Sequence, residues 1–284
     1  MTIKIGVCFF GITRSVSYTI GNIEKNIYQP LEKLGAEVKK FAHFFELEKI
    51  ENARSGETGK IDINEADLLR LDDVFFEKPE RFLSKSSFEL VKGYGDFWQD
   101  DNKSIRNLYH QLHSMKTVTQ KCLEWDPDIV LFLRPDLSYH DNFSTVLCRA
   151  LKKVGSEHLF LPNWQHFNGF NDRFAIAVGQ EAIKSYGLRY NNILNFCRKY
   201  DAPLHSERLL KFSSEGIRVS FIPLRASRVR VNGVVVEELF LHYKTMNFAE
   251  WLDGAISLSS SLKKRLVWGV QKLRFGDPYK NLEK

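Results

Sequence analysis

The feature of this 284-residue chain that most restricts its fold is an unbroken apolar run from Ile129 to Leu133. A strand covered by helices on both faces has this pattern, whereas a strand with one face in water alternates apolar and polar residues. The run follows a segment, Lys103 to Trp125, whose apolar residues recur at helical spacing, and Asp126-Pro127-Asp128 ends that helix. The chain is therefore expected to be an α/β protein with a mostly parallel, Rossmann-like central sheet flanked by helices.

The N-terminal residues predict a β-α-β unit. A strand is expected at residues 3–10, a polar loop at 13–17, a helix at 18–34 and a second strand at 37–44. Nucleotide-binding α/β domains begin in this way. Residues 11–15 lack the complete glycine-rich phosphate-loop patterns. Gly11, Thr13 and Arg14 are nevertheless placed to contact a nucleotide, with Arg14 available to a diphosphate.

The rest of the chain predicts one domain and a tail. Residues 46–103 are polar and rich in glycine, so loops and short helices are expected there. Further helices are expected at 142–154, 181–200 and 206–213, and further strands at 158–162, 173–178, 217–222 and 234–241. No repeat or low-complexity linker divides the chain. Residues 1–245 are therefore predicted to form a single domain, and residues 246–284 a C-terminal amphipathic helical tail.

Composition and the N-terminal residues indicate the compartment. The four cysteines, Cys8, Cys122, Cys148 and Cys197, are scattered within apolar stretches and are predicted to be reduced core residues. Residues 1–10 lack the features of a signal peptide, and no window reaches the roughly 20 apolar residues of a membrane-spanning helix. A cytoplasmic protein is expected.

Positive charge is concentrated near the C-terminus. The chain has a net charge of +6, and residues 260–284 contain seven Lys or Arg residues against two acidic ones. Leu262, Leu266, Val267, Val270 and Leu273 share one helical face, with basic residues around the rest. This pattern is typical of a helix lying on an anionic membrane, here the inner face of the cell membrane. A terminal helix docked on the domain is the alternative.

The strongest candidate site follows the central strand. Arg134-Pro135-Asp136 lies where open α/β sheets bind ligands. A carboxylate such as Asp136 can hold a divalent cation, Mn²⁺ or Mg²⁺, that neutralises a diphosphate leaving group. A structural ion pair between Arg134 and Asp136 is the alternative interpretation. Ser138 stands where a second aspartate of an Asp-x-Asp pair would lie, which leaves the metal requirement open.

Two later segments offer sugar contacts and a general base. Asn163, Trp164 and Asp172 are candidates to line a sugar site, because aromatic faces pack on C–H surfaces and polar groups bind hydroxyls. Alternatively Trp164 belongs to the core and Asp172 pairs with Arg173. Glu207, at the start of a predicted helix, is a candidate to deprotonate an acceptor hydroxyl. Asp172 is the rival for that role, and helix capping is the structural alternative for Glu207.

Two further groups complete the candidate residues. His242, after an apolar run, is a candidate second ligand to the cation beside Asp136, or an ordinary surface residue. Arg225, Arg228 and Arg230 would share one face of a strand. They are candidates for phosphate binding, or they form a solvated edge.

The order of these motifs resembles a known family. Residues 11–15, the helix leading into residues 129–139, and residues 171–177, 205–210 and 228–233 together resemble bacterial and viral GT-A-fold glycosyltransferases of surface-polysaccharide gene clusters. The resemblance covers roughly residues 3–244. It implies that Asp136 bridges a metal to the nucleotide diphosphate, that Glu207 lines the acceptor site, and that His242 matches a C-terminal histidine on the metal.

The resemblance also implies a reaction. A sugar would pass from a nucleoside-diphosphate sugar to a glycan or lipid-linked acceptor in capsule or lipopolysaccharide synthesis, and direct displacement would invert the anomeric centre. A nucleotidyltransferase or phosphotransferase is the alternative enzyme, although the expected glycine-lysine phosphate loop is missing. A non-catalytic glycan- or nucleic-acid-binding protein is the other alternative. Nucleic acid is not expected as a partner, because basic and aromatic residues do not interleave as in an RNA-binding sheet.

Overall fold

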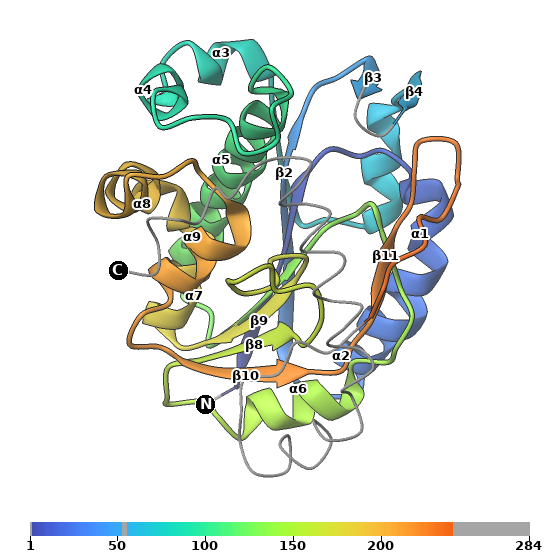
Figure 1. Ribbon diagram of the computed structural model, residues 1–284. Helices are drawn as coiled ribbons and strands as arrows, with labels where there is room; N and C mark the ends of the chain where they lie inside the picture. Colours follow the sequence, from blue (N-terminus) through green and yellow to red (C-terminus); the bar gives the residue numbers. More distant parts are fainter. Residues whose placement is uncertain (1, 53–55, 241–284) are drawn as a thin grey trace, which may run out of the picture.

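A seven-stranded sheet forms the centre of the molecule in the computed structural model, which describes residues 2–52 and 56–240. The strands lie in the order β10-β8-β9-β6-β1-β2-β5 (Figure 1). Their bounds are β1 Lys4–Gly11, β2 Glu37–Phe45, β5 Asp73–Glu77, β6 Ile129–Leu133, β8 His158–Pro162, β9 Ala175–Val178 and β10 Arg218–Ile222. Two short pairs lie outside it: β3 Lys49–Asn52 with β4 Glu57–Lys60, and β7 Leu137–Tyr139 with β11 Ala226–Arg228.

All neighbouring strands of this sheet run parallel except at β9, which is antiparallel to both β6 and β8. The predicted mostly parallel sheet is therefore confirmed. The carboxyl ends of β1, β2 and β6 meet at one edge, and the reversed strand β9 begins at that same edge, with Ala175 opposite Phe132. Residues just after β6 and residues just before β9 are consequently brought together.

Helices cover both faces of the sheet, as the apolar run predicted. Every residue of β6 is fully buried. Along β1, Ile5, Val7 and Phe9 enter one core cluster, and Cys8 and Phe10 enter the other. One face is covered by α5 Lys103–Glu124, α7 Gln180–Gly187, α8 Ile193–Tyr200 and α9 Ser206–Ser213, and the other by α1 Val16–Ile23, α2 Gln29–Glu32 and α6 Ser144–Leu151 (Figure 1).

Short helical segments complete the fold. A π-helical turn, η1 Glu24–Tyr28, joins α1 to α2, so the helix predicted at residues 18–34 is one helical segment with a wide turn inside it. The polar segment 46–103 contains η2 Ile63–Leu69, α3 Pro79–Leu83 and α4 Phe88–Lys92, as expected, together with the strands β3, β4 and β5.

The structure corrects three sequence predictions. The edge strand β5 was not predicted, because its five residues alternate between half-buried and exposed and lie inside a polar segment. The helix predicted at 181–200 is divided by η3 Arg189–Asn192, where the guanidinium of Arg189 is fully buried. Residues 234–240 do not form the predicted strand. Val234 and Val235 are more than half exposed, and the strand-like pairing there is an isolated bridge between Val229 and Val235.

Cys8, Cys122 and Cys197 are buried as predicted, but Cys148 is exposed on α6.

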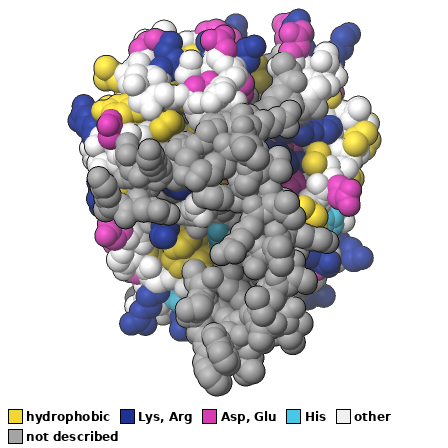
Figure 2. Space-filling model, viewed as in Figure 1, with side chains coloured by type: hydrophobic (Ala, Val, Ile, Leu, Met, Phe, Trp, Pro, Cys, Tyr) yellow, Lys and Arg dark blue, Asp and Glu magenta, His cyan; other side chains and the backbone are white. Residues whose placement is uncertain are grey.

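Among the described residues no helix is long and apolar enough to cross a membrane. Along the upper edge of the face in Figure 2, basic and acidic side chains are interspersed. The predicted tail at 246–284 and His242 lie outside the described residues.

Candidate active site

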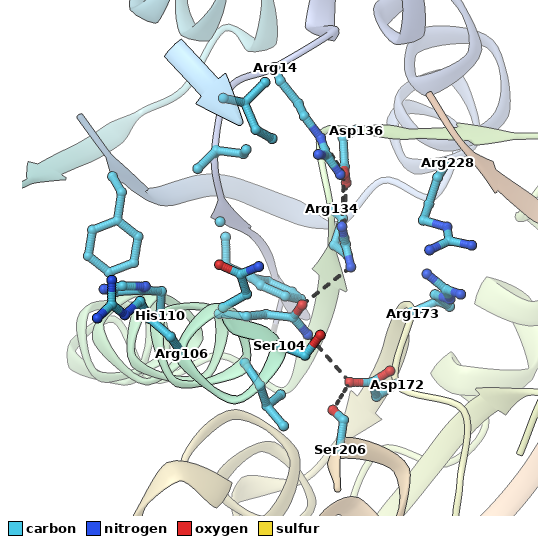
Figure 3. Close-up of a pocket in the computed structure, with 18 of the residues that line it drawn as sticks. Arg14, Ser104, Arg106, His110, Arg134, Asp136, Asp172, Arg173, Ser206 and Arg228 are labelled. Carbon is cyan, nitrogen blue, oxygen red and sulfur yellow. Dashed lines mark hydrogen bonds and ion pairs between the residues drawn. The ribbon is translucent and has the colours of Figure 1, made fainter. Parts of the chain in front are cut away.

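A cavity of about 740 Å³ opens at the sheet edge where β1 and β6 end and β9 begins. Its walls are completed by α5 and by the first turn of α9 (Figure 3). Ligands of open α/β sheets bind at this edge, because loops after parallel strands converge there. Of the predicted site residues, it brings together Gly11, Arg14, Arg134, Asp136, Asp172, Glu207 and Arg228.

Asp136 is held between two guanidinium groups. Arg14 donates to its Oδ2 from Nη2 at 2.6 Å, and Arg134 donates from Nη2 to Oδ2 at 2.8 Å and from Nε to Oδ1 at 2.9 Å. The carboxylate is 2% exposed. Burial alone would raise the pKa of Asp136, but the charges of Arg134 and Arg14 outweigh it and hold that pKa well below its ordinary value.

These contacts favour the ion-pair interpretation of Asp136 over a metal ligand. Both of its carboxylate oxygens already accept hydrogen bonds from guanidinium groups. A divalent cation prefers several oxygen ligands and would stand beside two positive charges here. The donor set around Asp136 therefore does not fit a divalent cation, and the alternative of an ion pair with Arg134 describes the observed geometry.

More arginines surround this pair. Arg14 and Arg230 both donate to Glu57 Oε2 at 2.8 Å, and Arg228 donates to Glu238 Oε1 at 2.7 Å. Arg173 lies 3.9 Å from the same Glu238 oxygen. The arginine cluster is defined as Arg14, Arg134, Arg173, Arg228 and Arg230, all of which line the cavity. Its five guanidinium groups face three paired carboxylates, Glu57, Asp136 and Glu238, which leaves an excess of two positive charges.

Two carboxyl groups occupy another wall of the cavity. Asp172 precedes β9, and its Oδ2 accepts hydrogen bonds from Ser206 Oγ and, at 3.4 Å, from Gln111 Nε2. Gln111 Oε1 also accepts from Arg134 Nη1 at 3.3 Å, so Gln111 bridges the arginine cluster and the carboxyl groups. The fully buried Arg189 lies 3.5 Å from Asp172. These contacts fix the position of the Asp172 side chain.

Glu207 is the less constrained carboxyl group. Burial, reinforced by the negative charge of Asp172, raises the pKa of Glu207 to about 8. His205 Nδ1 lies 3.2 Å from Glu207 Oε2, but burial lowers the pKa of His205 to about 3. The imidazole is therefore neutral, and the contact is not a charge pair. A carboxyl group with a pKa near neutrality is suited to exchange a proton with a substrate.

Four candidate residues lie outside the cavity lining: Thr13, Asn163, Trp164 and Arg225. Trp164 is 1% exposed, and its Nε1 donates to the carbonyl of Leu224 at 2.8 Å, so the alternative of a core residue is correct. Thr13 donates to the carbonyl of Asp62, and the backbone N–H of Asn163 donates to Ile222. Arg225 pairs instead with Asp141 at 2.8 Å, so it does not share a face with Arg228 and Arg230.

Several cavity residues were not predicted. Trp98 lines the cavity and stacks on His205, with ring centroids 5.7 Å apart and 13° between the planes. Phe97 meets the same imidazole edge-on at 4.9 Å. Gln111 could have been found as a polar position among the apolar residues of α5, next to the cavity-lining His110. Nothing in the sequence around Trp98 distinguishes it, because its place depends on contact with a segment about a hundred residues later.

Comparisons with known proteins find a similar structure but no similar sequence. No protein-family model and no curated protein matches the sequence. Among solved structures, mouse xyloside xylosyltransferase 1 in its apo form matches with a TM-score of 0.40 and 12% identity, over 78% of this chain and 85% of that chain. A likeness at this level does not extend to residues, substrate or mechanism.

Proposed function

We propose that this protein is a glycosyltransferase that moves a sugar from a nucleoside-diphosphate sugar to an acceptor hydroxyl. The observation that carries the proposal is the division of one cavity into an arginine cluster with two excess positive charges and a carboxyl wall with Asp172 and Glu207. A nucleotide-sugar transferase needs this combination: cations for the departing diphosphate and a base for the incoming hydroxyl.

The donor diphosphate would bind at the arginine cluster. Guanidinium groups bind phosphate oxygens bidentately, and their charge does not depend on pH. Arg14 and Arg134 are already held in position by Asp136, so little reorganisation is needed when charge develops on the leaving group. The nucleoside would lie against Phe10, Gly11 and Phe45, at the ends of β1 and β2. In this arrangement arginines neutralise the diphosphate, and Asp136 positions them.

The acceptor would enter beside Glu207. Its hydroxyl oxygen forms the new bond to the anomeric carbon, the bond from that carbon to the diphosphate oxygen breaks, and the electron pair leaves with the diphosphate. Glu207 in its ionised form takes the hydroxyl proton. Removal from water and, after it, the negative charge of Asp172 keep the pKa of Glu207 high, which makes its carboxylate a stronger base. Such a direct displacement inverts the anomeric centre.

Aromatic residues support the carbohydrate assignment. Trp98 and Phe97 line the cavity together with Glu207 and Ser206. Flat aromatic faces beside polar groups suit the alternating C–H and hydroxyl surfaces of a sugar ring. The more specific proposal of a glycan or lipid-linked acceptor in surface-polysaccharide synthesis rests on the sequence resemblance alone.

A thermal-shift screen tests the donor site. The protein is heated with UDP, GDP, dTDP, CDP or CMP, each in EDTA and in manganese. A ligand at about 100 times its Kd adds about 2.7 kcal/mol of stability, which is several degrees in Tm. We expect one diphosphate to raise Tm in EDTA, and Arg134→Ala to abolish the shift. Arg225→Ala, which removes an arginine outside the cavity, is the matched control.

Two outcomes would contradict the proposal. No shift with any nucleotide, from protein shown to be folded, would favour a non-catalytic binding protein. A shift that requires manganese and disappears in Asp136→Asn, but not in Arg134→Ala, would restore Asp136 as a metal ligand and remove the arginine mechanism.

A further inference from the structure

Three residues outside the proposed reaction, His43, Glu77 and His113, lie together at the ends of β2 and β5 and on α5. We propose that they form a binding site for a zinc ion or a similar transition-metal cation. One ligand atom from each residue lies within 4.8 Å of the other two. Two imidazole nitrogens and a carboxylate oxygen form a common ligand set of zinc sites that keep one open position.

The two distances to the Glu77 oxygen are close to those around such an ion. His43 Nε2 lies 3.3 Å from Glu77 Oε2, and His113 Nε2 lies 2.7 Å from the same oxygen. With bonds of about 2.0–2.2 Å, ligand atoms around a tetrahedral zinc ion lie roughly 3.3–3.6 Å apart. The His43 contact already has this spacing. The ring of His113 must withdraw by well under 1 Å, and its side chain is 19% exposed on α5.

The protonation states also suit a cation. Burial is the main cause that lowers the pKa of His43 to about 4, and the charge of a protonated His113 nearby is the second cause. Burial also lowers the pKa of His113. Both imidazoles are therefore neutral near pH 7. With the Glu77 carboxylate they form a group of net charge −1, and Lys116 is the nearby positive charge. Metal binding requires neutral imidazoles and an ionised carboxylate.

The surroundings allow the ligands to turn toward an ion. The Nδ1 atom of the 1% exposed His43 has no hydrogen-bond partner among the described residues, so moving its proton from Nε2 to Nδ1 breaks no bond there. Phe82 stacks on His113 with centroids 3.7 Å apart, and Phe45 packs against both histidines. An apolar shell of this kind limits water access. Glu77 is 27% exposed, which leaves room for a water ligand.

The site is separate from the proposed catalytic groups but adjoins the cavity. Phe45, which packs against both histidines, lines the cavity wall. His110 and Pro79, two residues after Glu77, line it as well. An ion bound here would tie α5 to the ends of β2 and β5. It would therefore stabilise that wall, whatever reaction the cavity performs.

Metal binding by the untagged, full-length protein tests the proposal. After removal of metal with EDTA, zinc affinity is measured by competition with a chromogenic chelator, and cobalt is added as a spectroscopic probe. We expect one zinc ion per chain, a rise in Tm with zinc, and the intense visible absorption of tetrahedral cobalt without a thiolate charge-transfer band. Loss of one ligand is expected to weaken zinc binding about 100-fold, because even the loss of a group that only hydrogen-bonds to a metal ligand lowers metal affinity by roughly 10–100-fold.

The variants are Glu77→Gln and His113→Gln, whose side chains are partly exposed, with His110→Gln as the matched control on the same helix. His110 contacts Phe45 and Phe82, and its Nε2 donates to the carbonyl oxygen of Pro79 at 3.3 Å. The control should bind zinc as the wild type does. No zinc binding by the folded wild type would overturn the proposal. A cobalt spectrum with a thiolate band would also overturn it, because the metal would then be bound by a cysteine such as the exposed Cys148. Both of these outcomes are measured on the wild type, so they decide the proposal even if a variant fails to fold.

Discussion

The pKa of Glu207, whose side chain is 15% exposed, is about 8 in the folded protein against an ordinary 4.5. Between these values the folded chain holds a proton that the unfolded chain has released, so folding stability falls as pH rises from about 4.5 to about 8. Glu207→Gln removes this loss. We expect its Tm to exceed that of the wild type by a margin that grows across this pH range.

The matched control is Glu215→Gln, since the side chain of Glu215 is 79% exposed. Its difference in Tm from the wild type should stay constant with pH. A Glu207→Gln margin that is equally independent of pH would show that the pKa of Glu207 is not raised in the fold.

Asp136 is only 2% exposed, and its negative charge balances the positive charges of Arg14 and Arg134, with which it forms hydrogen bonds. Asp136→Asn leaves Arg14 and Arg134 without that charge, and breaking a buried pair costs about 3–5 kcal/mol. We expect a loss of this size in the free energy of urea unfolding. Asp141→Asn, which breaks the exposed pair with Arg225, should change it little. Equal effects of the two variants would contradict the structural role given to Asp136.

Individual site residues were predictable only where a strong pattern placed them. Arg134 and Asp136 follow an apolar run whose end could be read from the sequence, and both line the cavity. Trp164 could not be assigned in this way, because it is covered by segments distant in the sequence. Its hydrogen-bond partner, for example, is the carbonyl of Leu224, 60 residues later. A tryptophan beside polar residues looks the same in the sequence whether a sugar or the core covers it.

At the scale of elements, the loop after β8 is fixed against the start of α9 through Gly169. The backbone N–H of Phe170 donates to the carbonyl of Glu207 at 2.8 Å, and a Cβ added at Gly169 would meet the backbone of Glu207 and Arg208. We expect Gly169→Ala to lower the free energy of unfolding by about 1–3 kcal/mol, as overpacking does, and to displace Glu207.

Gly21→Ala is the control for the effect predicted for Gly169→Ala. Gly21 lies within α1, and an added Cβ would meet nothing within 4 Å. Alanine there should stabilise the helix by about 0.5–1 kcal/mol. Both changes can be measured by urea unfolding. A neutral Gly169→Ala would mean that the loop does not hold α9 in place.

Elements with a strong internal pattern were predicted within a few residues, and elements that depend on distant partners were not. The helix α5 covers Lys103–Glu124 as its apolar spacing indicated. The edge strand β5 is fixed by pairing with β2, about thirty residues earlier, and its own residues carry only a weak alternation. The apolar residues at 234–239 suggested a strand, but three of them are more than half exposed.

At the scale of the whole molecule, the direction of β9 decides the composition of the cavity. A parallel strand at this position would place the residues before it, Asp172 and Arg173, at the opposite edge of the sheet, far from Arg134. The sequence indicated a mostly parallel sheet but not which strand is reversed, because strand direction follows from connections rather than from local pattern. The joining of the arginine cluster to the carboxyl wall was therefore visible only in the structure.

The most direct test of the central claim is the release of nucleoside diphosphate from nucleotide sugars, measured in EDTA with a glycan acceptor. We predict turnover without added metal that rises with pH toward about 8, where Glu207 ionises. Glu207→Gln should lower kcat by about 100-fold or more, the usual contribution of a general base, and Arg225→Ala should not. A requirement for manganese or magnesium in protein supplied with zinc, or turnover that survives in Glu207→Gln, would contradict the account.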